Sequence, residues 1–574
     1  MKLLLKYLKP YRGFIALALT IKVLATLVEL AIPYILSHIL DVAVPAGSIP
    51  PILLWGCVMV SCALLALLGN ITANRMAAKI ARNTTHKIRH RLFESIMELS
   101  NRQIDDFTIP SLESRLTSDT YHVHHFVGMI LRMGVRAPIL LMGGLLITAM
   151  LDHRLTLVMV AVLPLITLTM VLITKKGIPL FKASQKSVDH MVRIVREDAK
   201  GIRVIKALSK TDYERRRYDE ANKSLVRNEQ RASTTMAASN PLVTLFLNLG
   251  LTSVVLVGAF LVNGGLSSPG KIIAFIQYFT MISMATIALS RIFVNFSKGA
   301  ASAGRIEEVI ETKPELTVAS PEQYPDHKDE DYLVFDHVSF SYLGKKNNLT
   351  DISVSVPKGG TLGIIGATGS GKSTLLYLLM RFYDVNEGSI RIGGRDIRTI
   401  PPEELTALFG VVMQNDFLYA DSIRENIRFG RELSDEEIDR AASLAQAKEF
   451  IMAYEDGYDH PLVSKAANIS GGQKQRLLIA RALAKNPDIL LLDDSSSALD
   501  YKTDAALRKS IREHMQSSTT IVVAQRVSSV MNADRILVLD EGCVIGYGTH
   551  EELLESCSVY REISDSQIGG AILE

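Results

Sequence analysis

Cysteine is scarce in this sequence, with four residues among 574. No two of them form a C-x-x-C pair or another spacing typical of metal ligands. Cys57 and Cys62 lie in an apolar stretch, whereas Cys543 and Cys557 lie in the polar half of the chain. We therefore expect four unpaired thiols, and neither a disulfide framework nor a cysteine-based metal site.

A strong net charge is also missing. The 63 Lys and Arg residues nearly balance the 60 Asp and Glu residues, which leaves a formal charge of +3. A chain this close to neutrality gives no basis for a nucleic-acid partner. Its length of 574 residues predicts two or three domains.

Hydrophobic residues, in contrast, make up 48% of the chain, and the longest apolar stretches fall within residues 1–300. A helix needs about 20 residues to cross the hydrocarbon core of a bilayer. Six stretches reach this length: Gly13–Leu40, Pro51–Ile71, Phe126–Met150, Leu155–Thr174, Pro241–Val262 and Ile272–Phe293. The first is too long for a removable signal peptide and lacks a small-residue cleavage site. We expect an α-helical transmembrane domain with six spans.

The distribution of positive charge predicts the orientation of these spans. Four Lys and Arg residues lie within residues 1–12, and sixteen lie within residues 175–231. The short turns at 41–50 and 151–154 contain only Arg154. Cytoplasmic segments are the ones enriched in Lys and Arg, so the N-terminus and the long polar segments are expected in the cytoplasm.

Two polar segments between the spans, residues 72–125 and 175–240, have a helical pattern and almost no proline. Folded as out-and-back helix pairs, each would project about 40 Å into the cytoplasm. Their turns are expected at residues 106–116 and 201–207.

Five charged residues fall inside or near the ends of the spans. Lys22 and Glu29 share one face of the first span, Arg132 and Arg136 share one face of the third, and Arg291 lies near the cytoplasmic end of the sixth. The arginines are expected to extend toward lipid headgroups. For Glu29 two interpretations remain open: it lines a cavity and attracts cationic substrates, or it pairs with a neighbouring helix.

The second half of the chain contains a phosphate-binding loop after the apolar strand 361–365. The loop reads Gly366-Ala367-Thr368-Gly369-Ser370-Gly371-Lys372-Ser373 and fits G-x-x-x-x-G-K-[ST]. Its backbone N–H groups are suited to cradle phosphates, and Lys372 and Ser373 are expected to contact phosphate and Mg²⁺. A second apolar strand, 489–493, ends in Asp493, and Ser470-Gly471-Gly472-Gln473 lies between the two.

A phosphate-binding loop, then S-G-G-Q, then an apolar strand ending in Asp, in this order and spacing, resembles the ATP-binding cassette (ABC) proteins. The resemblance covers essentially the whole chain. It implies an α/β P-loop cassette over residues 333–574, joined by a linker over 301–332 to the transmembrane domain over 1–300. It also implies that the two long polar segments contain coupling segments that dock on cassettes.

The same resemblance assigns a site for ATP and Mg²⁺. Tyr342 stands where the family stacks an aromatic ring on adenine, and Gln414 matches the family's Q-loop. The residues expected at this chain's own nucleotide are Tyr342, Gly366, Thr368, Gly369, Ser370, Gly371, Lys372, Ser373, Thr374, Gln414 and Asp493, with Ser373, Gln414 and Asp493 toward Mg²⁺. The residues expected at the nucleotide of a second cassette are Ser470, Gly471, Gly472 and Gln473, and the turn Ser497-Ala498-Leu499-Asp500 is expected at the same interface.

Two positions depart from the family pattern. The catalytic Glu of the family is replaced by Asp494, and the switch His is replaced by Gln525. Hydrolysis needs a base that orients water in line with the γ-phosphate, and a misplacement of about 1 Å can cost of the order of 10²-fold in rate. We interpret Asp494 and Gln525 as degenerate catalytic residues in a site that binds ATP and hydrolyses it poorly.

These features resemble one subunit of a heterodimeric bacterial ABC exporter in the plasma membrane. Such an exporter moves hydrophobic or amphipathic, multidrug-type compounds out of the cytoplasm or inner leaflet by alternating access. The partner would supply the catalytic Glu and switch His, and membrane lipid would surround the spans. Two alternatives remain open: a homodimeric exporter or lipid flippase with weak hydrolysis by Asp494, and an ATP-gated regulator or channel.

Overall fold

The computed structural model describes residues 1–414, 416–495 and 498–568, without the side chains of residues 290, 291, 293, 294 and 568. The chain forms two compact units. The first contains residues 1–98 and 107–312, and the second contains residues 99–106 and 313–574. A short segment of the first cytoplasmic loop therefore belongs to the second unit. The side chain of Arg291 and residue Ser497 lie outside the described residues.

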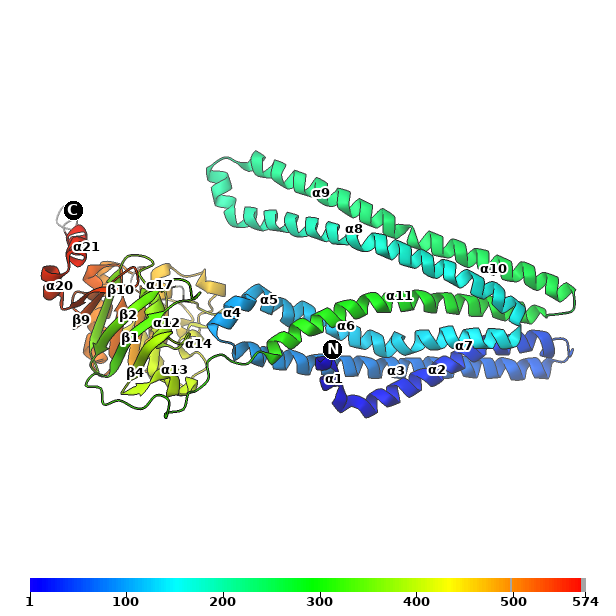
Figure 1. Ribbon diagram of the computed structural model, residues 1–574, viewed down its shortest axis with the longest axis horizontal. Coiled ribbons are helices and arrows are strands. Elements are labelled where there is room, and N and C mark those ends of the chain that lie inside the picture. The colour runs from blue at the N-terminus through cyan, green and yellow to red at the C-terminus, as the bar shows by residue number, and fades with distance from the viewer. Residues whose placement is uncertain (415, 496–497, 569–574) are drawn as a thin grey trace. The chain divides into compact units, whose positions relative to one another are not determined.

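The first unit is entirely helical (Figure 1). Its main helices are α1 (Lys2–Leu8), α2 (Arg12–His38), α3 (Ile49–Met97), α5 (Ile109–Ser114), α6 (Thr120–Met129), α7 (Val135–Leu151), α8 (His153–Ala207), α9 (Thr211–Ala237), α10 (Ser239–Asn263) and α11 (Pro269–Glu311). Within the described residues, six helical stretches are long and apolar enough to cross a membrane. Five of the six expected spans lie within one of these stretches each, and the sixth, Ile272–Phe293, overlaps the stretch Pro269–Leu289 and lies within α11. This confirms the expected fold of the first unit.

The spans pack through apolar side chains and closely approaching backbones. Leu30, Tyr278 and Phe279 are buried in a cluster formed by α2, α7, α8 and α11. The Tyr278 hydroxyl donates a 2.6 Å hydrogen bond to the backbone oxygen of Leu30. Gly250 brings α10 against α11, because a Cβ at this position would lie 2.5 Å from the Phe279 ring. Small residues allow such close contact between transmembrane helices.

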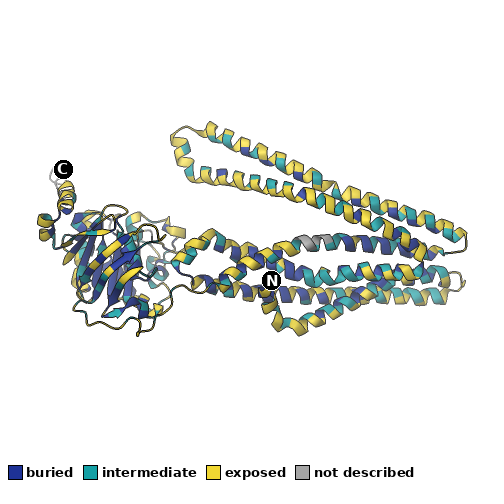
Figure 2. Ribbon diagram, in the orientation of Figure 1, coloured by how far each residue is buried: buried dark blue, intermediate teal, exposed yellow. Residues whose placement is uncertain are grey.

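The long polar segments are helical, as expected, but the first is interrupted at residues 98–100 and at Thr108. The hairpin of α8 and α9 is mostly exposed (Figure 2), and a 2.8 Å hydrogen bond from Asn228 to Ser187 joins its two arms. The position of its turn differs from the expected 201–207. Helix α8 continues to Ala207, and the chain reverses at residues 208–210, where Ser209 has a positive φ of 51°. Gly201 alone does not end the helix, because a single glycine in a helix costs only about 1 kcal/mol relative to alanine.

Glu29 forms an ion pair inside the first unit. The Nη2 of Arg136 on α7 lies 2.6 Å from Oε1 of Glu29 on α2, and the Arg136 Nε lies 3.3 Å from the second carboxylate oxygen. This bidentate contact supports the interpretation that Glu29 pairs with a neighbouring helix. The expectation that Arg136 extends toward headgroups is wrong, because its guanidinium points at this carboxylate.

The second unit contains two sheets (Figure 1). The first has the order β2-β1-β4-β5, and the second has the order β10-β9-β3-β8-β7-β6. The strands are β1 (Leu333–Phe340), β2 (Leu349–Val356), β3 (Thr361–Gly366), β4 (Glu387–Ile392), β5 (Arg395–Asp396), β6 (Phe409–Val412), β7 (Ile489–Asp493), β8 (Thr519–Val523), β9 (Arg535–Asp540) and β10 (Cys543–Gly548). The helices are α4 (Asn101–Phe107), α12 (Lys372–Leu379), α13 (Pro402–Leu408), α14 (Ile423–Arg428), α15 (Asp435–Leu444), α16 (Lys448–Met452), α17 (Gly471–Leu483), α18 (Tyr501–His514), α19 (Val527–Val530), α20 (His550–Ser556) and α21 (Ser558–Ile568).

The six-stranded sheet explains where the site forms. Strands β6, β7, β8, β3 and β9 are parallel, and only β10 is antiparallel to its neighbour. The apolar run of β7 is buried along its whole length, as parallel strands covered on both faces require. The carboxyl ends of parallel strands meet at one edge, so the loops after β3, β6, β7 and β8 come together there.

Candidate functional site

The loop after β3 has the geometry of a phosphate cradle. It leads directly into α12, whose first residue is Lys372. Gly371 precedes this helix with a φ of 100°, and a Cβ there would lie 2.5 Å from the side chain of Leu349. At Gly366 a Cβ would lie 2.1 Å from the backbone oxygen of Leu539. Both positions therefore require glycine, and Gly369 faces open space between them.

Lys372 folds back over this loop. Its ammonium donates hydrogen bonds of 2.9 and 2.7 Å to the backbone oxygens of Gly366 and Ala367. Burial lowers the pKa of Lys372, and the nearby carboxylates of Asp493 and Asp494 oppose this effect. The lysine thus lies across the mouth of the cradle, where the N-terminus of α12 and the loop amides favour an anion.

Two atoms at the base of the cradle match a bound metal nucleotide. Asp493 Oδ2 and Ser370 Oγ are buried, and neither has a hydrogen-bond partner within the described residues. The Ser373 hydroxyl also contacts the Asp493 carboxylate. Groups of three or more His, Cys, Asp or Glu that would bind a metal alone are absent from the described parts of the chain. A hydroxyl, one carboxylate and nucleotide phosphates together form the oxygen-rich set that Mg²⁺ prefers.

Acidification is expected to weaken Mg²⁺-dependent nucleotide binding at a higher pH than an ordinary aspartate would dictate. Burial raises the pKa of Asp493 above 3.8, partly offset by the Ser373 hydroxyl. Since only the carboxylate binds Mg²⁺, affinity should fall as the pH drops through this raised pKa. Fluorescent-nucleotide titrations across pH with Mg²⁺ or with EDTA measure this. The inflection should disappear in EDTA and in Asp493→Asn, and an inflection that persists in both would assign it to another group.

Asp494 lies at the centre of the site, directly after β7. Its backbone has a positive φ of 47°, and its N–H donates a 2.9 Å hydrogen bond to Val523 of β8. Its Oδ2 accepts a 3.2 Å hydrogen bond from Gln525 Nε2, and the Gln414 side chain also hydrogen-bonds this carboxylate. The loops after β6, β7 and β8 thus bring together three residues that the sequence associates with hydrolysis.

Arg526 is a charged neighbour of Asp494 that sequence reasoning missed. Burial raises the pKa of Asp494, and the Arg526 guanidinium is the largest opposing influence. A raised pKa favours general-base chemistry. An aspartate is shorter than a glutamate by one C–C bond of about 1.5 Å, so its carboxylate reaches less far from the backbone. The adjacency of Arg526 to Gln525 in the sequence was the available signal.

Tyr342 lies beside the cradle, two residues beyond the end of β1. Its hydroxyl contacts Thr374 Oγ1 at 3.2 Å, and its ring packs against Tyr383 with 5.1 Å between centroids. Tyr383 in turn donates a 3.3 Å hydrogen bond to Asp105 of α4. Burial raises the pKa of Tyr383 to about 12, and the Asp105 charge contributes. Tyr342, the residue expected to stack on adenine, is thus connected through Tyr383 to Asp105 of the first cytoplasmic loop.

Segment 99–106 is held on the second unit by further polar contacts. Gln103 donates a 2.8 Å hydrogen bond to the backbone oxygen of Lys313. The Glu315 carboxylate accepts a hydrogen bond of 3.1 Å from Ser100 and one of 3.3 Å from Arg102. The part of the expected coupling region that packs with the cassette therefore begins before the predicted 106–116.

The S-G-G-Q segment opens α17. Ser470 is the N-cap and forms a capping box with Gln473. The Gln473 N–H donates a 3.2 Å hydrogen bond to Ser470 Oγ, and the Ser470 N–H donates a 2.9 Å hydrogen bond to Gln473 Oε1. A Cβ at Gly472 would lie 3.2 Å from the backbone oxygen of Ala498. Ser470 and Gly471 are exposed, and within the described ranges no hydrogen bond joins them to residues 366–373. This end of α17 is available to a ligand outside the chain's own cradle.

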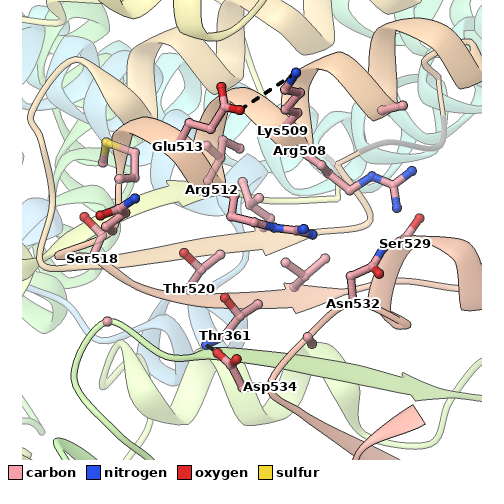
Figure 3. Close-up of a pocket in the computed structure, with 18 of the residues that line it drawn as sticks. Thr361, Arg508, Lys509, Arg512, Glu513, Ser518, Thr520, Ser529, Asn532 and Asp534 are labelled. Carbon is pink, nitrogen blue, oxygen red and sulfur yellow. Dashed lines mark hydrogen bonds and ion pairs between the residues drawn. The ribbon is translucent and has the colours of Figure 1, made fainter. Parts of the chain in front are cut away.

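The second unit also contains a cavity of about 920 Å³ that is separate from this site. It is lined by α18 and by residues at the start of β3 and β8, including Thr361 and Thr520 (Figure 3). The phosphate-binding loop follows the opposite end of β3. The cavity contains none of the residues expected to bind ATP, so its size does not mark the nucleotide site.

Comparisons with known proteins cover both units. Residues 15–286 match the family described as the ABC transporter transmembrane region, and residues 349–497 match the family described as ABC transporter. The ABC transporter ATP-binding protein YfiB of Bacillus subtilis (strain 168) is 34% identical over 571 residues, which span 98% of each chain. YknU of the same organism, which has the same description, is 32% identical over 569 residues, covering 99% of this chain and 97% of YknU.

The fold has a close match among solved structures. The structure of a bacterial Atm1-family ABC exporter with ATP bound superposes with a TM-score of 0.81. The match covers 97% of this chain and 98% of that one, at 24% sequence identity. It shows that the two chains share a fold.

Proposed function

We propose that this chain, which belongs to the ABC transporters, is the degenerate-site subunit of a heterodimeric exporter. It is a multi-pass membrane protein with one six-helix transmembrane region and one cytoplasmic ATP-binding cassette. Its own cassette would bind ATP and Mg²⁺ and hydrolyse ATP slowly. A partner half-transporter would hold the site of rapid hydrolysis.

The contact between Gln525 and Asp494 is the observation that carries this proposal. Asp494 occupies the position of the base, and its carboxylate would be too short to reach an in-line water. The amides of Gln525 and Gln414 hold this carboxylate by hydrogen bonds. In the position of the switch residue, an amide replaces an imidazole, and an amide cannot carry positive charge. The cradle itself retains Lys372, Ser373 and Asp493, which favour binding.

The exposed N-terminus of α17 gives the chain its second role. Ser470 and Gly471 would meet ATP held by the partner's cassette, where the N–H groups and the helix dipole stabilise the γ-phosphate. The Asp105–Tyr383–Tyr342 contacts would link nucleotide binding to the first cytoplasmic loop. ATP-driven closure of the two cassettes would then open the membrane cavity outward, and hydrolysis at the partner's site would reset it.

The cargo would be hydrophobic or amphipathic, and the bacterial plasma membrane is the proposed location. Hydrophobic residues make up 48% of the chain, and the spans provide extended apolar walls. Such walls bind the apolar part of a ligand without requiring a particular shape.

The purified chain alone is expected to show little ATPase activity, because its only carboxylate in the base position is Asp494. Co-expression with a partner half-transporter that has Glu and His at the two altered positions should restore activity. Phosphate release from nanodisc-reconstituted protein measures both. Rapid, cooperative and substrate-stimulated turnover by this chain alone would overturn the heterodimer.

A further inference from the structure

A polar cluster lies inside the membrane-spanning part of the first unit. Lys22 on α2 is only 3% exposed. Its ammonium donates hydrogen bonds of 2.7 Å to Asn70 and 3.1 Å to Asn74, which lie one helical turn apart on α3. A charged ammonium at this depth is costly, and two amide oxygens solvate it without neutralising it.

Two arginines and one glutamate complete this cluster. Arg132 and Arg136 lie close enough to act on the Lys22 charge, and so does Glu29. Arg136 is paired with Glu29. Arg132 donates a 2.9 Å hydrogen bond to the backbone oxygen of Gly128, and among the described residues no carboxylate lies within ion-pair distance of it. Three positive charges and one negative charge leave an excess of two positive charges.

Gly128 allows the Arg132 guanidinium to take this position. A Cβ at residue 128 would lie 3.3 Å from Arg132 Nη2 and 3.7 Å from Ala81 of α3. The absence of a side chain at residue 128 therefore leaves room for the guanidinium beside α6, where it is held by its hydrogen bond to the Gly128 carbonyl.

The cluster faces away from the most exposed apolar surface of α2. Leu17, Leu24 and Leu27 are each at least half exposed. At 100° per residue they lie on the side of the helix opposite to Lys22 and Glu29. The Glu29–Arg136 pair is itself partly exposed. Because lipid is a poor environment for an exposed ion pair, this side is the one suited to a water-filled cavity.

The cluster lies in the cytoplasmic half of the bilayer. Lys22 is nine residues from the start of the first span, Arg132 is six residues from the start of the third, and both spans begin in the cytoplasm. At 1.5 Å per residue these distances correspond to depths of about 14 and 9 Å. A headgroup that enters from the inner leaflet passes through this depth.

We propose that Lys22, Arg132 and Arg136 form a binding site for the anionic headgroup of an amphipathic substrate. Arg132 offers guanidinium N–H groups to a phosphate or carboxylate, Lys22 adds a fixed charge, and the surrounding apolar walls hold the tail. The Glu29 carboxylate does not attract cations here, because Arg136 neutralises it. This assignment rests on the proposed exporter function and specifies the charge of its cargo.

The test compares three amphiphiles with the same dodecyl chain in the reconstituted heterodimer. The probes are dodecyl phosphate, dodecyltrimethylammonium and dodecyl maltoside, each below its micelle concentration, with inorganic phosphate as a fourth arm. Dodecyl phosphate should stimulate ATPase half-maximally at a concentration about tenfold lower than the cationic probe. A tenfold difference in affinity is about the effect of one hydrogen bond to a charged group. Inorganic phosphate should have no effect, because it lacks the tail.

Variants at Arg132 test whether the preference for the anionic probe depends on the cluster. Arg132→Gln should remove most of the anionic preference, and Arg132→Glu should shift it toward the cation. Arg154 is an exposed arginine in the first turn of α8, on the other side of the membrane. Arg154→Gln is therefore the matched control and should leave the preference unchanged. Basal ATPase without amphiphile reports whether each variant is folded and coupled to its partner.

The outcomes separate the two proposals. If basal ATPase is absent from the wild-type complex, the exporter proposal fails. If ATPase is present and the cationic probe is equal to or better than the anionic one, the anion site is wrong while the exporter stands. Stimulation by inorganic phosphate alone would identify a soluble anion in place of an amphiphile and would also contradict the assignment.

Discussion

Replacing Ser470 with Arg is expected to lower ATP hydrolysis and transport by the proposed heterodimer by about 10²-fold, the effect typical of losing one preorganised donor to a developing charge. Ser470 caps α17 through its contacts with Gln473 and is exposed at the helix N-terminus. An arginine there removes the cap and places a long side chain over N–H groups that would face the partner's γ-phosphate. Steady-state ATPase and vesicle transport measure the loss.

Two matched variants show whether this effect belongs to the partner's site. Ser443→Arg introduces the same bulk and charge at an exposed serine of α15 and should leave activity unchanged. Asp494→Asn should be far milder than Ser470→Arg if, as proposed, Asp494 contributes little to hydrolysis. If Asp494→Asn proves the more damaging of the two, this chain's own site performs the rapid hydrolysis.

Restoring both altered residues is expected to increase hydrolysis at this chain's own site by about 10²-fold. Asp494→Glu adds the methylene that carries the carboxylate about 1.5 Å further from β7. Gln525→His removes the amide that now holds Asp494 and supplies an imidazole that can carry charge. Vanadate trapping of labelled nucleotide, followed by separation of the subunits, measures the change.

Single variants provide the control for this gain. Gln525→His alone leaves the base too short and should change trapping little. Asp494→Glu alone should produce part of the gain, because the hydrogen bond from Gln525 can still restrain the longer side chain. Lack of any gain in the double variant would mean that these two residues do not account for slow hydrolysis.

The spans and the nucleotide site were predictable from the sequence because each depends on local rules. An apolar stretch of about 20 residues has to form a helix to satisfy its backbone in lipid, so the six spans were identified from length and composition. The loop at 366–373 could be placed because glycine at positions of steric crowding, followed by Lys and Ser, is an uncommon combination.

Contacts between distant segments could not be predicted in the same way. The Glu29–Arg136 pair joins residues 107 positions apart, and a face shared within one helix does not specify the neighbouring helix. The same applies to the contact between Asp105 and Tyr383. The turn at 208–210 lies beyond the predicted 201–207 because the helix-forming residues around Gly201 outweigh the cost of a single glycine. The effect of Arg526 on Asp494 depends on the packing of the loops after β7 and β8, which the sequence does not specify.

The location of vanadate-trapped nucleotide in the wild-type heterodimer tests the central claim most directly. Vanadate retains ADP only where hydrolysis has occurred, so it reports which site turns over. We expect trapped ADP on the partner subunit, and intact ATP retained by this chain at its Lys372 cradle. Equal amounts of trapped ADP on the two subunits, or more on this chain, would contradict it.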